Sequence, residues 1–273
     1  MPKLSKPENL RVYGRPPFNV SVVHGGPGAA GEMSPVARQL AFDRGVLEPI
    51  QTAASLDGQI EELRAVLETY GSLPITLVGF SWGAWLSYVL AARYPVIVKK
   101  LILVGSGPFE EKYVATIQET RLSRLSEAQR AEFESTVRTL NDPATKNKDI
   151  LLARLRQLAS RSDAYDPITN DSNETVSVGT QSNLFQSVWK DAAELRRSGR
   201  LLELGKHIAC PAVAIHGDYD PHPADGVQKP LAAVLKDFRF ILLKTCGHTP
   251  WMERKAKDRF YEILREELRE GNC

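Results

Sequence analysis

The sequence predicts an α/β fold in which a mostly parallel sheet is covered by helices on both faces and carries a helical insertion. Short apolar runs alternate with amphipathic stretches over residues 18–107 and again over residues 208–268, a pattern typical of parallel strands joined by helices. Between them, residues 108–204 hold no convincing strand, although a plain crossover needs only about a dozen residues. We therefore expect a core built from residues 1–107 and 205–273, with residues 108–204 inserted as a helical lid.

In the first part of the core, strands and helices alternate. Apolar runs rich in β-branched residues predict a short edge strand near residues 10–13 and longer strands at residues 18–23, 45–50, 74–78 and 99–104. Apolar residues at helical spacing predict helices at residues 31–40, 56–67 and 82–94. This order of elements is the one expected of a parallel sheet.

The remaining elements divide between the insertion and the second part of the core. Residues 117–140, 148–161 and 183–204 are expected to be helical, with a loop over residues 163–181. The sheet pattern then returns, with strands at 211–216 and 238–243 and helices at 224–235 and 252–268. An insertion at this place would emerge at the carboxyl ends of the strands, where open α/β sheets bind their ligands.

Composition and charge indicate a soluble protein without a nucleic-acid or membrane partner. The 273 residues are 42% hydrophobic and 25% charged, and the net charge is +2. No run approaches the ~20 apolar residues of a membrane span, and no signal-peptide core is present near the amino end. Cys210, Cys246 and Cys273 follow no metal-ligand spacing, so we expect a reduced, cytoplasmic protein that needs no metal or cofactor. The oligomeric state is left open.

The pentapeptide Gly79-Phe80-Ser81-Trp82-Gly83 lies between a predicted strand and a predicted helix. A Gly-x-Ser-x-Gly in that position is typical of a nucleophile elbow, a turn so tight that the two glycines must lack a Cβ. The strained serine is then raised above the sheet, where the helix begins. Ser81 is therefore the candidate nucleophile.

Ser81, Asp220 and His248 follow three different strands, in the order that a Ser-Asp-His triad of this elbow type requires. His248 would act as general base and then as general acid, while Asp220 would fix its tautomer and stabilise the imidazolium. Asp218 is the alternative carboxylate, but Asp220 lies further beyond the strand end and is better placed to reach over to His248.

The segment His24-Gly25-Gly26-Pro27-Gly28 follows the first long strand and must form a sharp loop. The backbone N–H groups of Gly26 and Trp82 are the expected oxyanion hole. We expect His24 to hold this loop by hydrogen bonding.

A substrate pocket is also expected beside the elbow. Gly25, Phe80 and Trp251 are candidate pocket residues, although packing of the elbow is the preferred explanation for Phe80.

These motifs together resemble the α/β-hydrolase superfamily, and within it the proline iminopeptidases of peptidase family S33. The resemblance covers residues 18–107 and 208–268 and leaves out the insertion. It implies an α/β-hydrolase fold and a serine hydrolase that works through an acyl-enzyme. The family usually has glycine where Phe80 stands. Its sheet normally begins with a two-strand hairpin, which 17 residues leave little room for, so we expect that hairpin to be short or absent.

For function, the resemblance implies an aminopeptidase that releases an amino-terminal residue, often proline, from short peptides. Acidic lid residues would bind the free ammonium, and the candidates are Asp163, Asp166, Asp171 and Glu174. The first alternative is an esterase, or another hydrolase of a small acyl substrate, with the same triad. The second is a non-catalytic receptor of the same fold that binds a small molecule.

Overall fold

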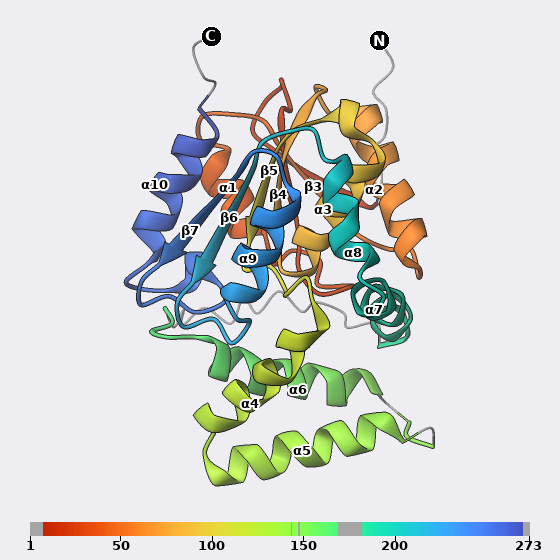
Figure 1. Ribbon diagram of the computed structural model, residues 1–273, viewed down its shortest axis with the longest axis vertical. Coiled ribbons are helices and arrows are strands. Elements are labelled where there is room, and N and C mark those ends of the chain that lie inside the picture. Colours follow the sequence, from red (N-terminus) through yellow and green to blue (C-terminus); the bar gives the residue numbers. More distant parts are fainter. Residues whose placement is uncertain (1–7, 143, 147, 169–181, 270–273) are drawn as a thin grey trace.

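In a computed structural model, the protein forms a seven-stranded sheet in the order β1-β3-β2-β4-β5-β6-β7 (Figure 1). The structure describes residues 8–142, 144–146, 148–168 and 182–269. The strands are β1 (Leu10–Tyr13), β2 (Val20–Val23), β3 (Val46–Pro49), β4 (Ile75–Phe80), β5 (Val98–Val104), β6 (Ala212–Gly217) and β7 (Phe238–Leu243). Among the strands of the described residues, only β1 pairs antiparallel to its neighbour, β3, so the prediction of a mostly parallel sheet is confirmed. The described chain supplies this single edge strand before β2, in place of a hairpin.

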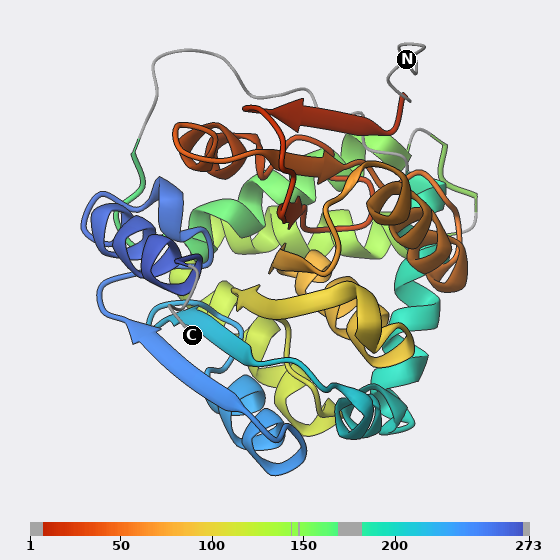
Figure 2. The same ribbon diagram turned by 90° about the horizontal axis from the view of Figure 1, so that it is seen from above.

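Helices cover both faces of the sheet (Figure 2). One face carries α1 (Ser34–Leu40) and α10 (Lys257–Glu267). The other carries α2 (Leu56–Tyr70), α3 (Trp82–Arg93), α8 (Arg200–Glu203) and α9 (Asp225–Val234). Two buried apolar clusters result, one on each side of the sheet. Short 3-10 turns lie at Pro95–Ile97, Glu111–Tyr113, Leu204–His207 and Pro250–Met252.

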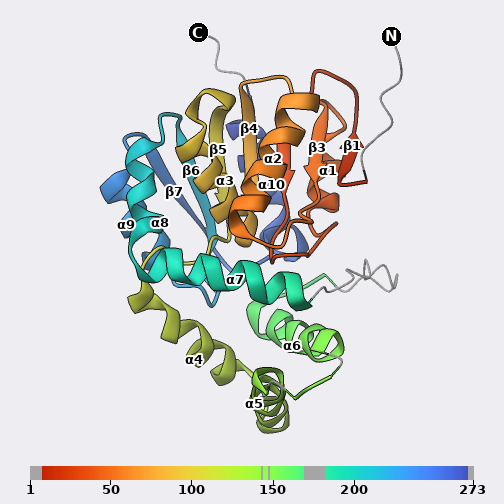
Figure 3. The same cartoon turned by 90° about the vertical axis from the view of Figure 1, so that its right-hand side faces the viewer.

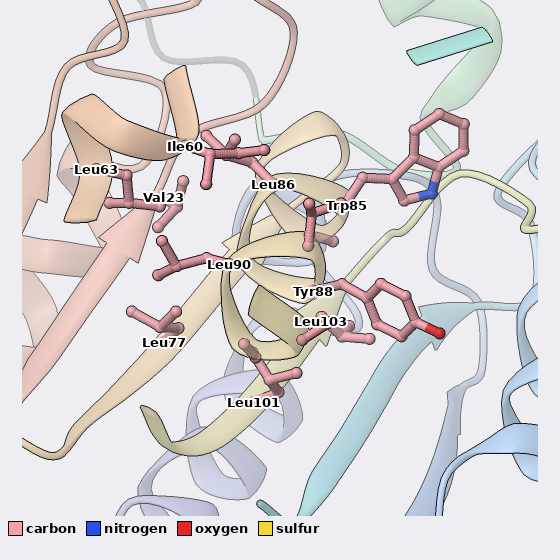
Figure 4. Packing of buried hydrophobic residues seen from close by; sticks show 14 of the residues in the cluster. Val23, Ile60, Leu63, Leu77, Trp85, Leu86, Tyr88, Leu90, Leu101 and Leu103 are labelled. Carbon is pink, nitrogen blue, oxygen red and sulfur yellow. The ribbon is translucent and has the colours of Figure 1, made fainter. Parts of the chain in front are cut away.

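The central helix of the larger cluster is α3, in which every residue from Trp82 to Ala92 is buried. Its apolar side chains pack between α2 and the strands β4 and β5 (Figure 4). A helix that is apolar all round is stable only when it is enclosed on every side, and α3 meets that condition. Packing of this helix therefore fixes the start of α3, where Ser81 lies.

The inserted segment forms a separate layer beyond the carboxyl ends of the strands (Figure 3). It contains α4 (Val114–Arg124), α5 (Glu127–Asn141) and α6 (Lys148–Asp163), which share a small apolar cluster of their own. Helix α7 (Ser182–Arg197) lies between this layer and the sheet, and its residues Leu184, Val188 and Ala192 join the main core cluster. No helix of the described ranges combines the length and the apolar character needed to cross a membrane.

The helical stretch expected over residues 117–140 is in fact two helices, α4 and α5, which meet at Leu125 and Ser126. The Ser126 side chain accepts a hydrogen bond from the Gln129 backbone N–H, and the Gln129 side chain accepts one from the Ser126 N–H. This reciprocal pair is a capping box, which begins a new helix and so ends the previous one. The Ser-x-x-Gln spacing was the sequence signal for this break.

Replacing Leu90 in the middle of α3 by alanine should destabilise the protein strongly. The Leu90 side chain is fully buried, so Leu90→Ala should lower the free energy of unfolding by about 2–5 kcal/mol. Val96 is 84% exposed, and Val96→Ala should change it by less than about 0.5 kcal/mol. Urea unfolding followed by circular dichroism measures both, and equal effects would contradict the packing described for α3.

Candidate active site

Ser81 lies at the junction of β4 and α3 with a backbone φ of 52° and ψ of −114°. A positive φ is rare for a residue with a side chain, and at Ser81 it results from the crowding around the turn. A Cβ on Gly79 would lie 2.4 Å from the Gly83 carbonyl oxygen, and one on Gly83 would lie 2.2 Å from that of Val23. Both elbow glycines are therefore required, and the close approach they allow fixes the position of Ser81.

His248 and Asp220 come together from the loops that follow β7 and β6. The Nδ1 atom of His248 lies 2.7 Å from Oδ2 of Asp220, whose carboxylate is completely buried. Asp218 instead accepts a hydrogen bond of 3.3 Å at Oδ1 from the backbone N–H of Cys246, and its Oδ2 atom lies 3.8 Å from Nζ of Lys244. Of the two aspartates weighed in the sequence, the structure thus brings Asp220 to the histidine.

A second histidine, His222, binds the same carboxylate, and the sequence reasoning gave it no role. Its Nδ1 atom lies 2.7 Å from Oδ1 of Asp220, and its backbone N–H donates to the same oxygen at 2.9 Å. Its ring centroid is 4.5 Å from that of His248. The carbonyl of His222 is in turn 2.8 Å from Nε2 of His216. Each carboxylate oxygen of Asp220 therefore lies at hydrogen-bond distance from a different imidazole, that of His222 or that of His248.

Asp220, His222 and His248 also form a group of three side chains that could ligate a metal, with ligand atoms within 4.8 Å of one another. Both Nδ1 atoms already lie at hydrogen-bond distance from Asp220. The described contacts therefore account for this arrangement as a hydrogen-bonded unit.

The pKa values of the two imidazoles that share this carboxylate are shifted in opposite directions. Burial alone would raise the pKa of Asp220, but the neighbouring histidine charges outweigh burial and hold it well below its usual value. Burial alone would lower the pKa of His248, but the charge and hydrogen bond of Asp220 outweigh burial and raise it. For His222, burial dominates, and the charge of His248 adds to it, so its pKa falls to about 4. His248 is the imidazole that accepts a proton more readily.

The loop after β2 is held by His24, as expected. The Gln51 backbone N–H donates to Nε2 of His24 at 3.2 Å, so the proton of the neutral ring is on Nδ1. Nδ1 then donates to the Gly25 carbonyl at 2.9 Å. Burial lowers the pKa of His24 to about 4, which keeps the ring neutral and this tautomer in place. Gly26 has a φ of +26°, a conformation that favours glycine.

A cavity of about 420 Å³ opens between the elbow and the inserted helices. Ser81, Trp82, Gly26, His222 and His248 all line it. Its remaining wall is largely apolar and aromatic, and includes Pro27, Trp85, Ile117, Phe133, Phe185 and Trp189. The cavity therefore has the nucleophile candidate, the imidazole and both oxyanion-hole candidates on one side and an apolar enclosure on the other.

The three residues named as pocket candidates, Gly25, Phe80 and Trp251, do not line this cavity. Phe80 is 1% exposed and packs beneath the site, with ring centroids 4.8 Å from His248 and 4.7 Å from Trp251. Trp251 is buried as well. Phe80 faces the core because it alternates with its neighbours along β4, and from there it supports the ring of His248.

The acidic residues considered for an ammonium are engaged elsewhere or lie outside the described residues. Asp163 accepts two hydrogen bonds from Arg121, from Nε at 2.8 Å and Nη2 at 2.6 Å. Asp166 lies 3.6 Å from Nε of Arg254. The other two candidates, Asp171 and Glu174, fall among residues 169–181, outside the described residues.

The elbow, the histidine–aspartate pair and the sheet order define the class of protein. A family model described as the alpha/beta hydrolase fold matches residues 20–255, so the chain belongs to that family and is an enzyme of the hydrolase type. The expected α/β-hydrolase fold is confirmed.

Among particular relatives, a 2-hydroxy-6-oxononadienedioate/2-hydroxy-6-oxononatrienedioate hydrolase of Paraburkholderia phymatum is 24% identical over 218 residues, 78% of this chain and 68% of that protein. The solved structure of VinJ matches with a TM-score of 0.68 at 18% identity, covering 95% of this chain and 93% of that one. A proline iminopeptidase of Mycobacterium smegmatis matches with a TM-score of 0.67 at 18% identity and the same coverage.

Histidine titration followed by NMR should separate the two imidazoles of the site. His248 should titrate above the ordinary value of about 6.5, whereas His222 and His24 should titrate near pH 4. Asp220→Asn should lower the pKa of His248, since burial remains after the charge is removed. Signals are assigned by replacing each histidine in turn with glutamine. A His248 pKa that is unchanged in Asp220→Asn would contradict the described pairing.

Proposed function

We propose that this protein is a serine hydrolase that cleaves a small, largely apolar acyl substrate through an acyl-enzyme on Ser81. The observation that carries the proposal is that Ser81 and His248 line one cavity while the Nδ1 side of His248 is held by buried Asp220. A serine beside an imidazole that a carboxylate orients is the arrangement by which enzymes turn a serine hydroxyl into a nucleophile. A receptor that only binds its ligand would have no need of it.

In the proposed mechanism, Nε2 of His248 takes the proton of the Ser81 hydroxyl as the oxygen attacks the substrate carbonyl. The negative oxygen of the tetrahedral intermediate is stabilised by the backbone N–H groups of Gly26 and Trp82, both at the cavity wall. Collapse of the intermediate breaks the bond to the leaving group, which receives the proton from His248. Water then attacks the acyl-enzyme by the same route, and the acid is released. Asp220 stabilises the imidazolium in each step.

The lining of the cavity favours a neutral or anionic acyl substrate over a peptide with a free ammonium. No aspartate or glutamate of the described residues lines the cavity, and a buried ammonium needs a carboxylate partner. The curated relative is named for small-molecule substrates, which fits the same choice. The geometry therefore supports the esterase or small-acyl hydrolase alternative better than the proline iminopeptidase type of aminopeptidase.

We also propose that α4, α5 and α6 act as a lid on a core formed by residues 1–107 and 205–273, with the lid segment spanning residues 108–204. Ile117 of α4 and Phe133 of α5 line the same cavity as Ser81, so these helices close the site from the side opposite the sheet. Enclosure of this kind excludes water and strengthens the electrostatic interactions inside. A cytoplasmic location remains an expectation from the sequence.

A fluorophosphonate probe tests the nucleophile directly. It should label the native protein on Ser81, and Ser81→Ala should abolish the labelling. Ser106, at the end of the next strand, β5, serves as the matched control, and Ser106→Ala should still be labelled. With any ester that is turned over, Ser81→Ala should lower kcat by about 10⁶. Labelling that persists in Ser81→Ala, or a native protein that is never labelled, would refute the proposal.

The substrate class is tested with 4-nitrophenyl esters of short acids beside Pro-, Ala- and Leu-amides. We expect turnover of the esters and little or none of the amides. If the amides are instead the better substrates, the aminopeptidase assignment is correct and the ester assignment is wrong.

A further inference from the structure

The cavity lining carries positive charge whose role the proposed mechanism does not explain. Apart from the two histidines, the ionisable side chains that line it are Arg121 and Arg196, and the described lining contains no acidic residue. Asp163, the carboxylate that holds Arg121 in two hydrogen bonds, is itself buried, so this ion pair is satisfied within the protein. Arg196 is therefore the residue to consider.

Arg196 is buried, but its partner is not. Its side chain is 6% exposed, and its described hydrogen bond runs from Nε to Oε2 of Glu111 at 2.8 Å. The Glu111 side chain is 49% exposed, so water screens this ion pair. A guanidinium has five N–H donors in a planar fork, and four of them are on the Nη atoms, which this bond does not use. Arg196 thus has donors for a further anion.

Aromatic rings connect Arg196 to the elbow through successive contacts. The Arg196 guanidinium lies over the ring of Trp85, 5.4 Å from its centroid. Trp189 is nearly parallel to Trp85, with an angle of 2° and a centroid distance of 5.9 Å. The Trp85 centroid is also 6.5 Å from that of Trp82, the residue next to Ser81, with an angle of 64° between the two rings. One ring–ring contact and one cation–ring contact thus lead from Trp82, beside the nucleophile, to the guanidinium of Arg196.

We propose that Arg196 is a specificity-determining residue that binds a carboxylate of the substrate, at the end remote from the bond that is cleaved. The apolar middle of the substrate would lie along Trp85 and Trp189, and its planar carboxylate would accept hydrogen bonds from the Nη atoms of Arg196. This inference rests on the proposed function, because it places the scissile carbonyl at Ser81. It assigns the substrate to the class of carboxylate-bearing esters or related acyl compounds.

The test compares matched substrates with and without a carboxylate. Mono-4-nitrophenyl adipate is paired with 4-nitrophenyl hexanoate, which puts the charge on the acid part. The pair 4-acetoxybenzoate and methyl 4-acetoxybenzoate puts it on the alcohol part. In the native protein the anionic ester of at least one pair should have the higher kcat/KM. A charged hydrogen bond of this kind should favour it by about 10- to 100-fold.

Three variants separate anion binding from a structural role. Arg196→Gln should lower the anionic-to-neutral ratio of kcat/KM at least tenfold. Arg197→Gln is the matched control, since Arg197 is the next residue on the same helix, is 59% exposed and pairs with Glu194; its ratio should stay within twofold of native. Glu111→Gln removes the competing carboxylate and should lower KM for the anionic ester. If Arg196 served only to hold Glu111, both Arg196→Gln and Glu111→Gln would leave the ratio unchanged.

Two results would overturn the inference: a native protein that prefers the neutral ester in both pairs, or an Arg196→Gln ratio equal to the native one. Either can occur while Ser81 is still labelled by fluorophosphonate and neutral esters are still hydrolysed. If the native protein were neither labelled by fluorophosphonate nor able to hydrolyse any ester, the proposed function itself would be refuted.

Discussion

The close approach of α3 to the strands β2 and β4 is the constraint on which the rest of the site depends. At Gly83 the helix backbone comes so near the Val23 carbonyl that even a methyl group would collide with it. Ser81, at the turn that joins β4 to α3, is left with a positive φ, a strain that the burial of all of α3 from Trp82 to Ala92 must offset. The position of the nucleophile candidate is therefore a consequence of core packing, and the loops need only bring the other groups to it.

The second organising feature is the buried carboxylate of Asp220. A buried charge is stable only with partners, and here two imidazoles and a backbone N–H supply them. Because both rings face one carboxylate, they do not gain protons independently. The pKa of His248 is raised while that of His222 is lowered, so one ring is suited to accept a proton and the other stays neutral. His222 thus acts as a hydrogen-bond partner that fixes the orientation of Asp220.

Local patterns in the sequence were sufficient for most of the fold. Apolar runs predicted the parallel strands. The glycines around Ser81 predicted the elbow, because few residue types other than glycine fit so tight a turn. Asp220 could be preferred to Asp218 since reach beyond a strand end is a local property. The break between α4 and α5 was also readable, from Ser126 and Gln129, but the helical pattern on both sides concealed it.

What could not be predicted depends on which surfaces meet. Arg196 and Trp85 are more than a hundred residues apart, and no sequence pattern indicates that one lies over the other. The same holds for Phe80, whose place beneath His248 follows from the register of β4 in the completed sheet.

In the proposed mechanism, Ser81 is activated by the His248–Asp220 pair and carries the acyl group during turnover. Rapid mixing with a slowly deacylated 4-nitrophenyl ester, followed by peptide mass spectrometry, tests it most directly. We expect a burst of one nitrophenolate per protein and the acyl mass on the peptide that contains Ser81, with both lost in His248→Ala. Steady hydrolysis without a burst and without any acylated peptide, or an acyl group on another residue, would contradict it.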